Sequence, residues 1–263
     1  FHFIGIVNKK NYNYPGLLTS QRFLDRYRFP NQILIHSKDR DWPEPAYLKR
    51  ALRLFTLGAM REKLVPMDSV FIERSYRQDL HQANTLKNSM KLLLAEHYIS
   101  GMMGVYGAYK NLDSLRSIQR DIRRNKVYKN MKRAENAALL KESLLKEDYL
   151  YYMEEDLITY NFNNLGWWNF QRSEIKKFMD GSNGAEREMG HRLLGYVNAL
   201  AEDNIDIVQS GDLIDEDALA FLFMLKTILE PDNFDFYMKV ISLSSKNEDF
   251  GTALFYLEEA LKK

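Results

Sequence analysis

The chain has 263 residues, of which 45% are hydrophobic and 28% charged, a balance typical of folded globular proteins rather than disordered ones. It contains no cysteine, which excludes disulfides, thiolate metal sites and a cysteine nucleophile. The net charge of +1 hides an asymmetry, because residues 1–150 carry 27 Lys and Arg against 15 Asp and Glu, whereas the remaining residues carry 10 against 21.

The first sixty residues alternate between apolar strands and amphipathic helices. Residues 3–7 and 32–36 are short, β-branched runs that predict buried strands. Residues 17–27 and 46–60 carry apolar side chains at helical spacing. This alternation predicts parallel pairing with a right-handed crossover. Because two strands are not stable alone, we expect further strands upstream of Phe1 or docking of this motif elsewhere.

After Pro66 no strand pattern remains, and the periodicity predicts helices. Residues 68–110 predict two helices, and residues 111–160 predict a long charged helical stretch that breaks near Asn125 or Asn130. Turns are expected at 161–166 and 181–184. Either Asp212 or Asp215 is the expected N-cap of a later helix. Further helices are predicted at residues 167–179, 185–203, 215–229, 233–246 and 249–262, with the short joins expected of antiparallel neighbours.

The last thirty residues carry a repeat-like pattern. Small residues at Ala253 and Ala260 let paired helices approach closely, and Pro231 precedes the pair as a proline that ends a preceding repeat would. The pattern resembles a tetratricopeptide repeat, and the residues that carry the resemblance are Tyr237, Glu248-Asp249-Phe250, Ala253, Leu257 and Ala260. Ile241 departs from the small residue that the resemblance implies at that position.

Two loops near the amino terminus resemble those of a known enzyme class. Asn8-Lys-Lys-Asn-Tyr-Asn-Tyr14 follows the first strand, and Asp39-Arg-Asp-Trp-Pro-Glu-Pro45 follows the second. Residues 3–58 therefore resemble the carboxy-terminal end of α/β-hydrolases of the dienelactone-hydrolase and esterase type. The resemblance implies that the first loop carries the triad acid and the second the triad histidine.

The residues at those positions do not suit the chemistry that the resemblance implies. Asn11 stands at the acid position and lacks the charge that stabilises an imidazolium. Arg40 stands at the histidine position and cannot act as a general base near neutral pH. The chain has no Gly-x-Ser-x-Gly nucleophile elbow. His36 is a weak catalytic candidate, because a lone histidine at a strand end is more often structural.

Other clusters are better explained by structure than by binding. Trp167, Trp168 and Tyr237 are candidate binding residues, although aromatic rings on a helical array more often pack between hairpins. A basic run between Arg116 and Arg133 contains only Tyr128 as a stacking aromatic, so we expect a solvated helix face rather than a nucleic-acid site. Its expected ion-pair partners are Asp113, Asp121 and Glu135. Gly101, Gly104 and Gly107 predict a close helix-packing groove.

The sequence therefore predicts a mainly α protein, with a truncated α/β-hydrolase-like segment at residues 1–62 and a domain of antiparallel, tetratricopeptide-like hairpins at residues 63–263. The favoured function is a non-catalytic bacterial scaffold that binds a protein or peptide on a concave or acidic face. We expect no metal, no cofactor, no nucleic acid and no membrane span.

Two alternatives remain open at this stage. The first is an esterase-type serine hydrolase whose nucleophile lies upstream of Phe1. The second is a nucleic-acid binder that uses the basic half and loses affinity steeply with salt. The compartment is open as well, with the bacterial periplasm or cell envelope as the candidate and any signal sequence upstream of Phe1.

Overall fold

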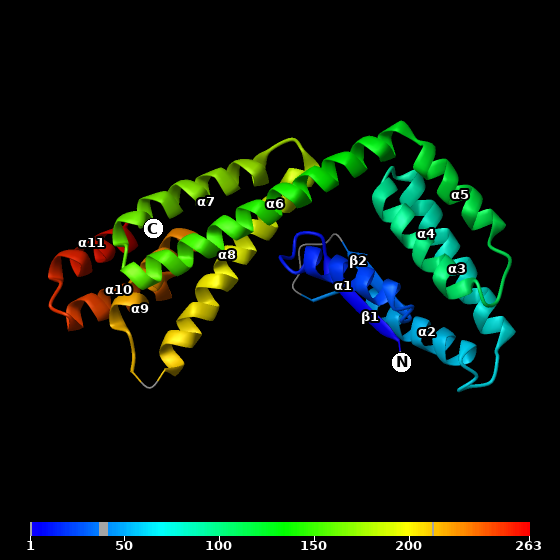
Figure 1. The fold of residues 1–263 in the computed structure, drawn as a ribbon, viewed down its shortest axis with the longest axis horizontal. Helices are drawn as coiled ribbons and strands as arrows, with labels where there is room; N and C mark the ends of the chain where they lie inside the picture. Colours follow the sequence, from blue (N-terminus) through cyan, green and yellow to red (C-terminus); the bar gives the residue numbers. More distant parts are fainter. Residues whose placement is uncertain (1, 37–41, 212) are drawn as a thin grey trace. The chain divides into compact units, whose positions relative to one another are not determined.

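The computed structural model describes residues 2–36, 42–211 and 213–263. In these ranges the protein is mainly helical and has one two-stranded sheet (Figure 1), as the sequence predicts. The elements are β1 (Phe3–Asn8), α1 (Tyr14–Arg26), β2 (Asn31–His36), α2 (Pro45–Arg61), α3 (Ser69–Asn88), α4 (Leu92–Tyr106), α5 (Asp113–Arg124), α6 (Lys126–Thr159), a 3-10 turn η1 (Phe162–Asn164), α7 (Leu165–Asp180), α8 (Gly184–Ser210), α9 (Glu216–Leu229), α10 (Phe234–Lys246) and α11 (Phe250–Leu261).

The chain forms two compact units. Unit 1 comprises Phe1–Ala137 and unit 2 comprises Ala138–Lys263, so the division falls inside the long helix α6. The boundary predicted at residues 62–63 lies inside unit 1. There α4 packs against β2 and against α2, which joins the strand segment and the helices that follow it into one packed body.

In unit 1, β1 and β2 pair in parallel, as the strand-helix-strand alternation predicts, with Phe3 opposite Asn31 and Asn8 opposite His36. Helix α1 packs against both strands. Leu34 belongs to an apolar core built with α2, α3, α4 and α5, in which Leu57, Ile99 and Leu115 are fully buried. The helices of unit 1 therefore supply the apolar cover that two strands alone would lack.

Helix α4 also contacts β2 with polar groups. The Nε2 atom of His97 lies 2.7 Å from the carbonyl oxygen of Ile33 and donates to it, because a carbonyl can only accept. Gly101 lies against Gln32 so closely that a Cβ there would stand 2.0 Å from the Gln32 Nε2 atom. The glycine predicted to allow close helix packing thus allows close packing of a helix on a strand.

A buried carboxylate holds α2, α3 and α4 together. Asp79 on α3 is fully buried and accepts hydrogen bonds from the hydroxyls of Tyr98 and Tyr106, each at 2.8 Å. The Arg53 guanidinium also contacts it, and Arg50 Nε lies 3.6 Å away. Burial, followed by the nearby carboxylate, raises the pKa of both tyrosines, so they stay protonated and keep donating.

In unit 2, α7, α8 and α9 pack against one another, and α10 packs against α9 and α11. The core is apolar, and Met153, Leu193, Phe221 and Leu225 within it are fully buried. Helix α9 is buried on nearly all sides, as expected of a helix surrounded by others. This burial makes α9 the central element of the unit.

The predicted helix limits are largely confirmed, and the side chains explain several of them. The break at Asn125 separates α5 from α6, and Asn125 Oδ1 accepts from the Val127 amide at 2.8 Å. Asp215 caps α9 by accepting from the Ala218 amide at 2.9 Å, whereas the alternative cap Asp212 lies outside the described residues. In the segment predicted as a turn, residues 162–164 form the 3-10 turn η1 and α7 already begins at Leu165.

None of the helices in the described part of the chain combines the length and the apolar character that crossing a membrane requires.

We expect Asp79→Leu to destabilise the protein by about 3–5 kcal/mol, because the buried Tyr106 and the partly buried arginines and Tyr98 around it would lose their acceptor. Urea unfolding of the full chain measures this change. The matched control is Asp113→Leu, which removes an exposed carboxylate paired with Arg116 at 3.2 Å and should cost no more than about 1 kcal/mol. Equal losses in the two variants would contradict a central role for Asp79.

Candidate functional site

The loop after β1 is a compact turn around Asn11. The Asn11 amide donates to the Asn8 carbonyl at 3.0 Å, and its side-chain oxygen accepts from the Asn13 amide at 2.9 Å. Tyr14, the first residue of α1, donates its amide to the Asn11 carbonyl at 2.9 Å. Asn11 therefore stabilises the turn that starts α1, a role that needs an amide or carboxylate oxygen but no charge.

His36 ends β2 and is a packing residue. Its side chain is 5% exposed, and its ring lies 5.5 Å from the Tyr47 ring in a tilted arrangement. Arg40, at the position where the hydrolase resemblance implies the catalytic histidine, lies outside the described residues. The described geometry places the Tyr47 ring beside His36.

The three predicted binding aromatics occupy unit 2, but two of them are buried. Trp168 is 1% exposed and donates its Nε1–H to Asp156 Oδ2 at 2.8 Å. Tyr237 is 4% exposed. Trp167 is partly buried, and its ring centroid lies 4.6 Å from that of Tyr152 in a tilted arrangement. Trp168 therefore packs in the core of the unit, and the Tyr237 ring lies 6.3 Å from the Tyr256 ring. Whether Trp167 contacts a partner stays a prediction.

Asp156 organises the start of α7. This carboxylate is 1% exposed and accepts from Trp168 and, at 2.7 and 2.9 Å, from the side-chain amide of Asn164. The side-chain Nδ2 atom of Asn161 lies 3.3 Å from Asp156 Oδ1. Each partner follows Asp156 within twelve residues, so the carboxylate fixes how the chain turns from α6 through η1 into α7.

A concave surface on unit 2 lies between α9, α10 and α11. This groove encloses about 490 Å³. Its apolar walls include Met224, Leu243 and Phe255, and its polar margin carries Asp217 and Asp249. The Phe255 side chain is 56% exposed. We refer to this surface as the α9–α11 groove. Periodicity indicates these helices but not the groove, because the groove depends on how the three helices pack.

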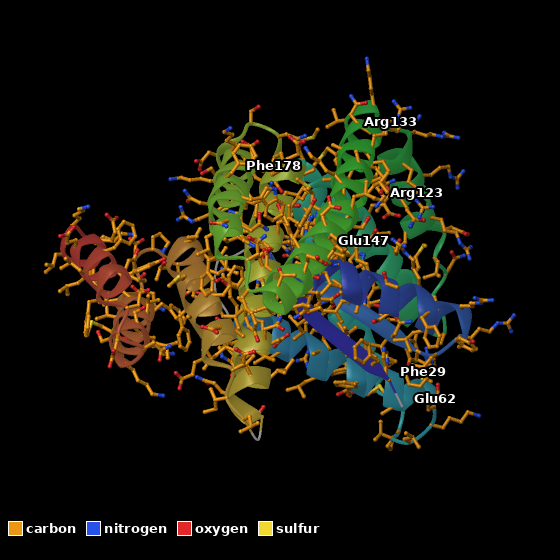
Figure 2. The ribbon with its side chains drawn as sticks, turned by 60° about the vertical axis from the view of Figure 1, so that its left-hand side comes forward. Phe29, Glu62, Arg123, Arg133, Glu147 and Phe178 are labelled. Atoms are coloured by element: carbon orange, nitrogen blue, oxygen red, sulfur yellow. The ribbon has the colours of Figure 1, made fainter. Side chains whose placement is uncertain are left out.

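The basic run on α5 and α6 is partly neutralised. Arg116 pairs with Asp113 at 3.2 Å and Lys132 pairs with Glu135 at 2.8 Å, which confirms two of the three predicted partners. Arg123 pairs with Glu96 of α4 at 2.6 Å. The Arg133 side chain is exposed (Figure 2). Ion pairing accounts for part of the charge on this face.

In the part of the chain that the structure describes, no three His, Asp or Glu side chains gather in an arrangement that could ligate a metal ion. None of the protein-family models matches the chain, and no curated protein or solved structure matches it.

We expect Trp168→Phe to destabilise the protein by about 2–3 kcal/mol, because it removes a buried hydrogen bond to a charged group while keeping an aromatic ring. The matched control is Trp167→Phe, which preserves the aromatic contacts of a partly buried ring and should cost less than about 1.5 kcal/mol. Chemical denaturation compares the two. A greater loss at Trp167 would contradict the proposed role of Asp156.

His97 makes stability depend on pH. Burial lowers the pKa of His97 from its ordinary value near 6.5, and burial lowers that of His2 as well. Near and below pH 6.5 these histidines therefore bind protons more readily in the unfolded chain than in the folded chain. The free energy of unfolding should fall as the pH drops from 7 to 5.

We expect His97→Gln, which keeps a donor for the Ile33 carbonyl, to flatten this loss of stability. Urea midpoints measured across the same pH range test the expectation. The control is His81→Gln, a change at an exposed position of α3, which should leave the slope as it is. A His97→Gln slope equal to that of the unsubstituted protein would show that His97 is not responsible.

Proposed function

We propose that the protein is a non-catalytic interaction scaffold that binds a peptide segment of another protein in the α9–α11 groove. The observation that carries the proposal is the chemistry of this groove, which combines the exposed apolar side chain of Phe255 with acidic residues at its margin. Apolar surface that stays exposed on a folded unit is a common mark of a binding site.

The groove suits a partner of complementary chemistry. Phe255 offers apolar contact for a large aliphatic or aromatic side chain. Asp217 and Asp249 would attract Lys or Arg residues beside that anchor. The acidic balance of the chain after residue 150, with 21 Asp and Glu against 10 Lys and Arg, adds long-range attraction for a basic partner. We therefore propose a peptide with an apolar anchor flanked by basic residues.

The proposal includes an antiparallel hairpin of tetratricopeptide type formed by α10 and α11. Its support is that the two helices pack against each other and that Ala253 is the buried residue of α11. A small side chain there suits close helix approach. Asp249 caps α11 through the Thr252 amide at 3.1 Å, so the acidic turn has a structural role as well as a place in the groove.

The non-catalytic part of the proposal rests on the first loop. Asn11 carries no charge and its side-chain oxygen accepts from the main chain of the same turn. We propose that residues 3–58 keep a hydrolase-like strand and helix order without the triad. The esterase alternative draws no support from the described residues around Asn11 and His36.

Selection from a displayed peptide library tests the proposal with the full chain as the target. We expect enriched peptides to carry one or two large apolar residues with Lys or Arg beside them. Phe255→Ala should weaken the best peptide by at least about tenfold, since it removes an apolar wall of the groove. Asp217→Lys should weaken it as well, and more strongly at low salt.

The matched control is Phe250→Ala, which makes the same change on the same helix at a side chain that is 68% exposed and lies outside the groove. Binding should survive this change. Enrichment of acidic peptides, equal loss in Phe250→Ala and Phe255→Ala, or no enrichment at all would contradict the proposed function.

A further inference from the structure

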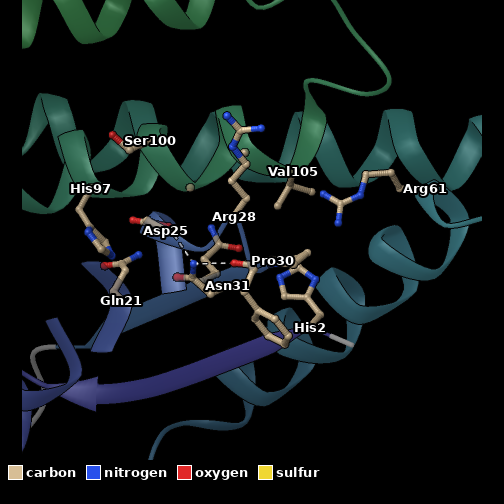
Figure 3. A pocket seen from close by; sticks show the side chains of 14 residues that line it. His2, Gln21, Asp25, Arg28, Pro30, Asn31, Arg61, His97, Ser100 and Val105 are labelled. Carbon is tan, nitrogen blue, oxygen red and sulfur yellow. Dashed lines mark hydrogen bonds between the residues drawn. The ribbon is translucent and has the colours of Figure 1, made fainter. Parts of the chain in front are cut away.

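A second concave site lies in unit 1, beside the free edge of β2. It is a cavity of about 310 Å³ between the end of α1, the start of β2, the end of α2 and one face of α4 (Figure 3). Polar side chains dominate its lining, and those that the argument uses are His2, Arg28, Asn31, Gln32 and Arg61. Its volume is at the lower end of the range for small-molecule sites.

Buried hydrogen-bonding atoms without a protein partner are concentrated at this cavity. Three buried side-chain atoms that have no hydrogen-bond partner within the described residues belong to residues that line it: His2 Nδ1, Asn31 Oδ1 and Gln32 Oε1. Gln32 is only 5% exposed. Since buried polar atoms without partners are costly, this concentration points to a ligand that supplies the missing partners.

The orientation of the Asn31 amide is fixed by its neighbours. Its nitrogen donates to Asp25 Oδ1 at 2.8 Å and to the Phe29 carbonyl at 3.0 Å, and both of those oxygens can only accept (Figure 3). The Asn31 Oδ1 atom is therefore the side-chain atom of this residue that has no hydrogen-bond partner. It requires an N–H or O–H donor, and so does the Gln32 Oε1 atom.

Two cations line the same cavity. Arg28 follows the end of α1 in the left-handed region, with φ of 54°. This backbone conformation costs a non-glycine residue about 1 kcal/mol or more, and it helps to place the arginine beside β2. Arg61, in the last turn of α2, donates its Nε–H to Glu62 at 3.0 Å. Figure 3 shows both side chains at the cavity, where their guanidinium groups suit a carboxylate.

Helix α4 provides room for a ligand through its glycines. A Cβ at Gly101 would stand 2.0 Å from Gln32 Nε2, so only glycine lets Gln32 occupy its place. A Cβ at Gly104 would meet nothing within 4 Å. Gly104 lines the cavity, so a larger side chain there would extend into open space without displacing the protein.

We propose that this cavity binds a free L-α-amino acid. Its carboxylate would pair with Arg28 and Arg61, and its ammonium group would donate to the Asn31 and Gln32 side-chain oxygens. One small zwitterion thus supplies both a negative charge beside the two arginines and the donors that the two amides require. This binding activity lies in unit 1 and does not depend on the α9–α11 groove of unit 2.

Isothermal titration calorimetry of the full chain with each proteinogenic L-amino acid tests the proposal. We expect at least one of them to bind with one-to-one stoichiometry. The methyl ester of the best ligand, which lacks the carboxylate charge, and the matching 2-hydroxy acid, which lacks the ammonium group, should each bind at least about tenfold more weakly.

Gly104→Leu should abolish binding by filling the cavity, while the thermal midpoint stays at or above that of the unsubstituted protein, since leucine is the better helix former. The matched control is Gly16→Leu on α1, where a Cβ also meets nothing within 4 Å and which does not line the cavity. Arg28→Gln and Arg61→Gln should each weaken binding at least about tenfold. These two variants test the assignment if Gly104→Leu does not fold.

The assignment would be overturned if no amino acid binds the full chain. It would also fail if a folded Gly104→Leu variant binds as well as the control, or if both arginine variants keep full affinity. A 2-hydroxy acid that binds as tightly as the amino acid would overturn the role of the ammonium group and with it the proposed ligand class.

Discussion

Buried carboxylates, each of which must be surrounded by donors, fix the helix packing of both units. In unit 1, Asp79 is fully buried and joins α3 to α2 through Arg53 and to α4 through Tyr98 and Tyr106. In unit 2, Asp156 directs the chain into α7. A buried charge that lost its partners would cost several kcal/mol, so these contacts restrict the helices far more than apolar contacts do, since apolar packing tolerates many similar arrangements.

The unit 1 cavity follows from this restriction. The Asp79 contacts fix α4, and α4 then presents His97, Gly101 and Gly104 to β2. His97 takes up one carbonyl of the strand edge, whereas the amide side chains of Asn31 and Gln32 each keep an oxygen that the protein does not satisfy. Buried polar atoms without a hydrogen-bond partner are rare in a well-packed unit. Here they belong to residues that line a cavity, and two arginines line the same cavity.

Much of the secondary structure could be predicted from local signals. Asn125 breaks the charged helical stretch because its side chain caps the following helix, and Asp215 begins α9 in the same way. Several helix ends gave no such signal, because residues such as Met90 and Glu248 take positive φ where a glycine is usual. The aromatic candidates Trp168 and Tyr237 were recognised, but their burial was not, since periodicity does not say what covers a helix face.

The mainly helical class, the parallel strand pair and most helix limits follow from local sequence patterns, because apolar periodicity and capping residues act over a few neighbouring positions. The burial of Asp79, the place of Gly104 at a cavity and the place of Phe255 at a groove follow from the packing of the helices. Each of these features depends on residues far apart in the chain, such as Arg28 and Gly104, and on the packing of whole helices. Local patterns do not show which distant residues come together, so these sites could not be predicted before the packing of the helices was known.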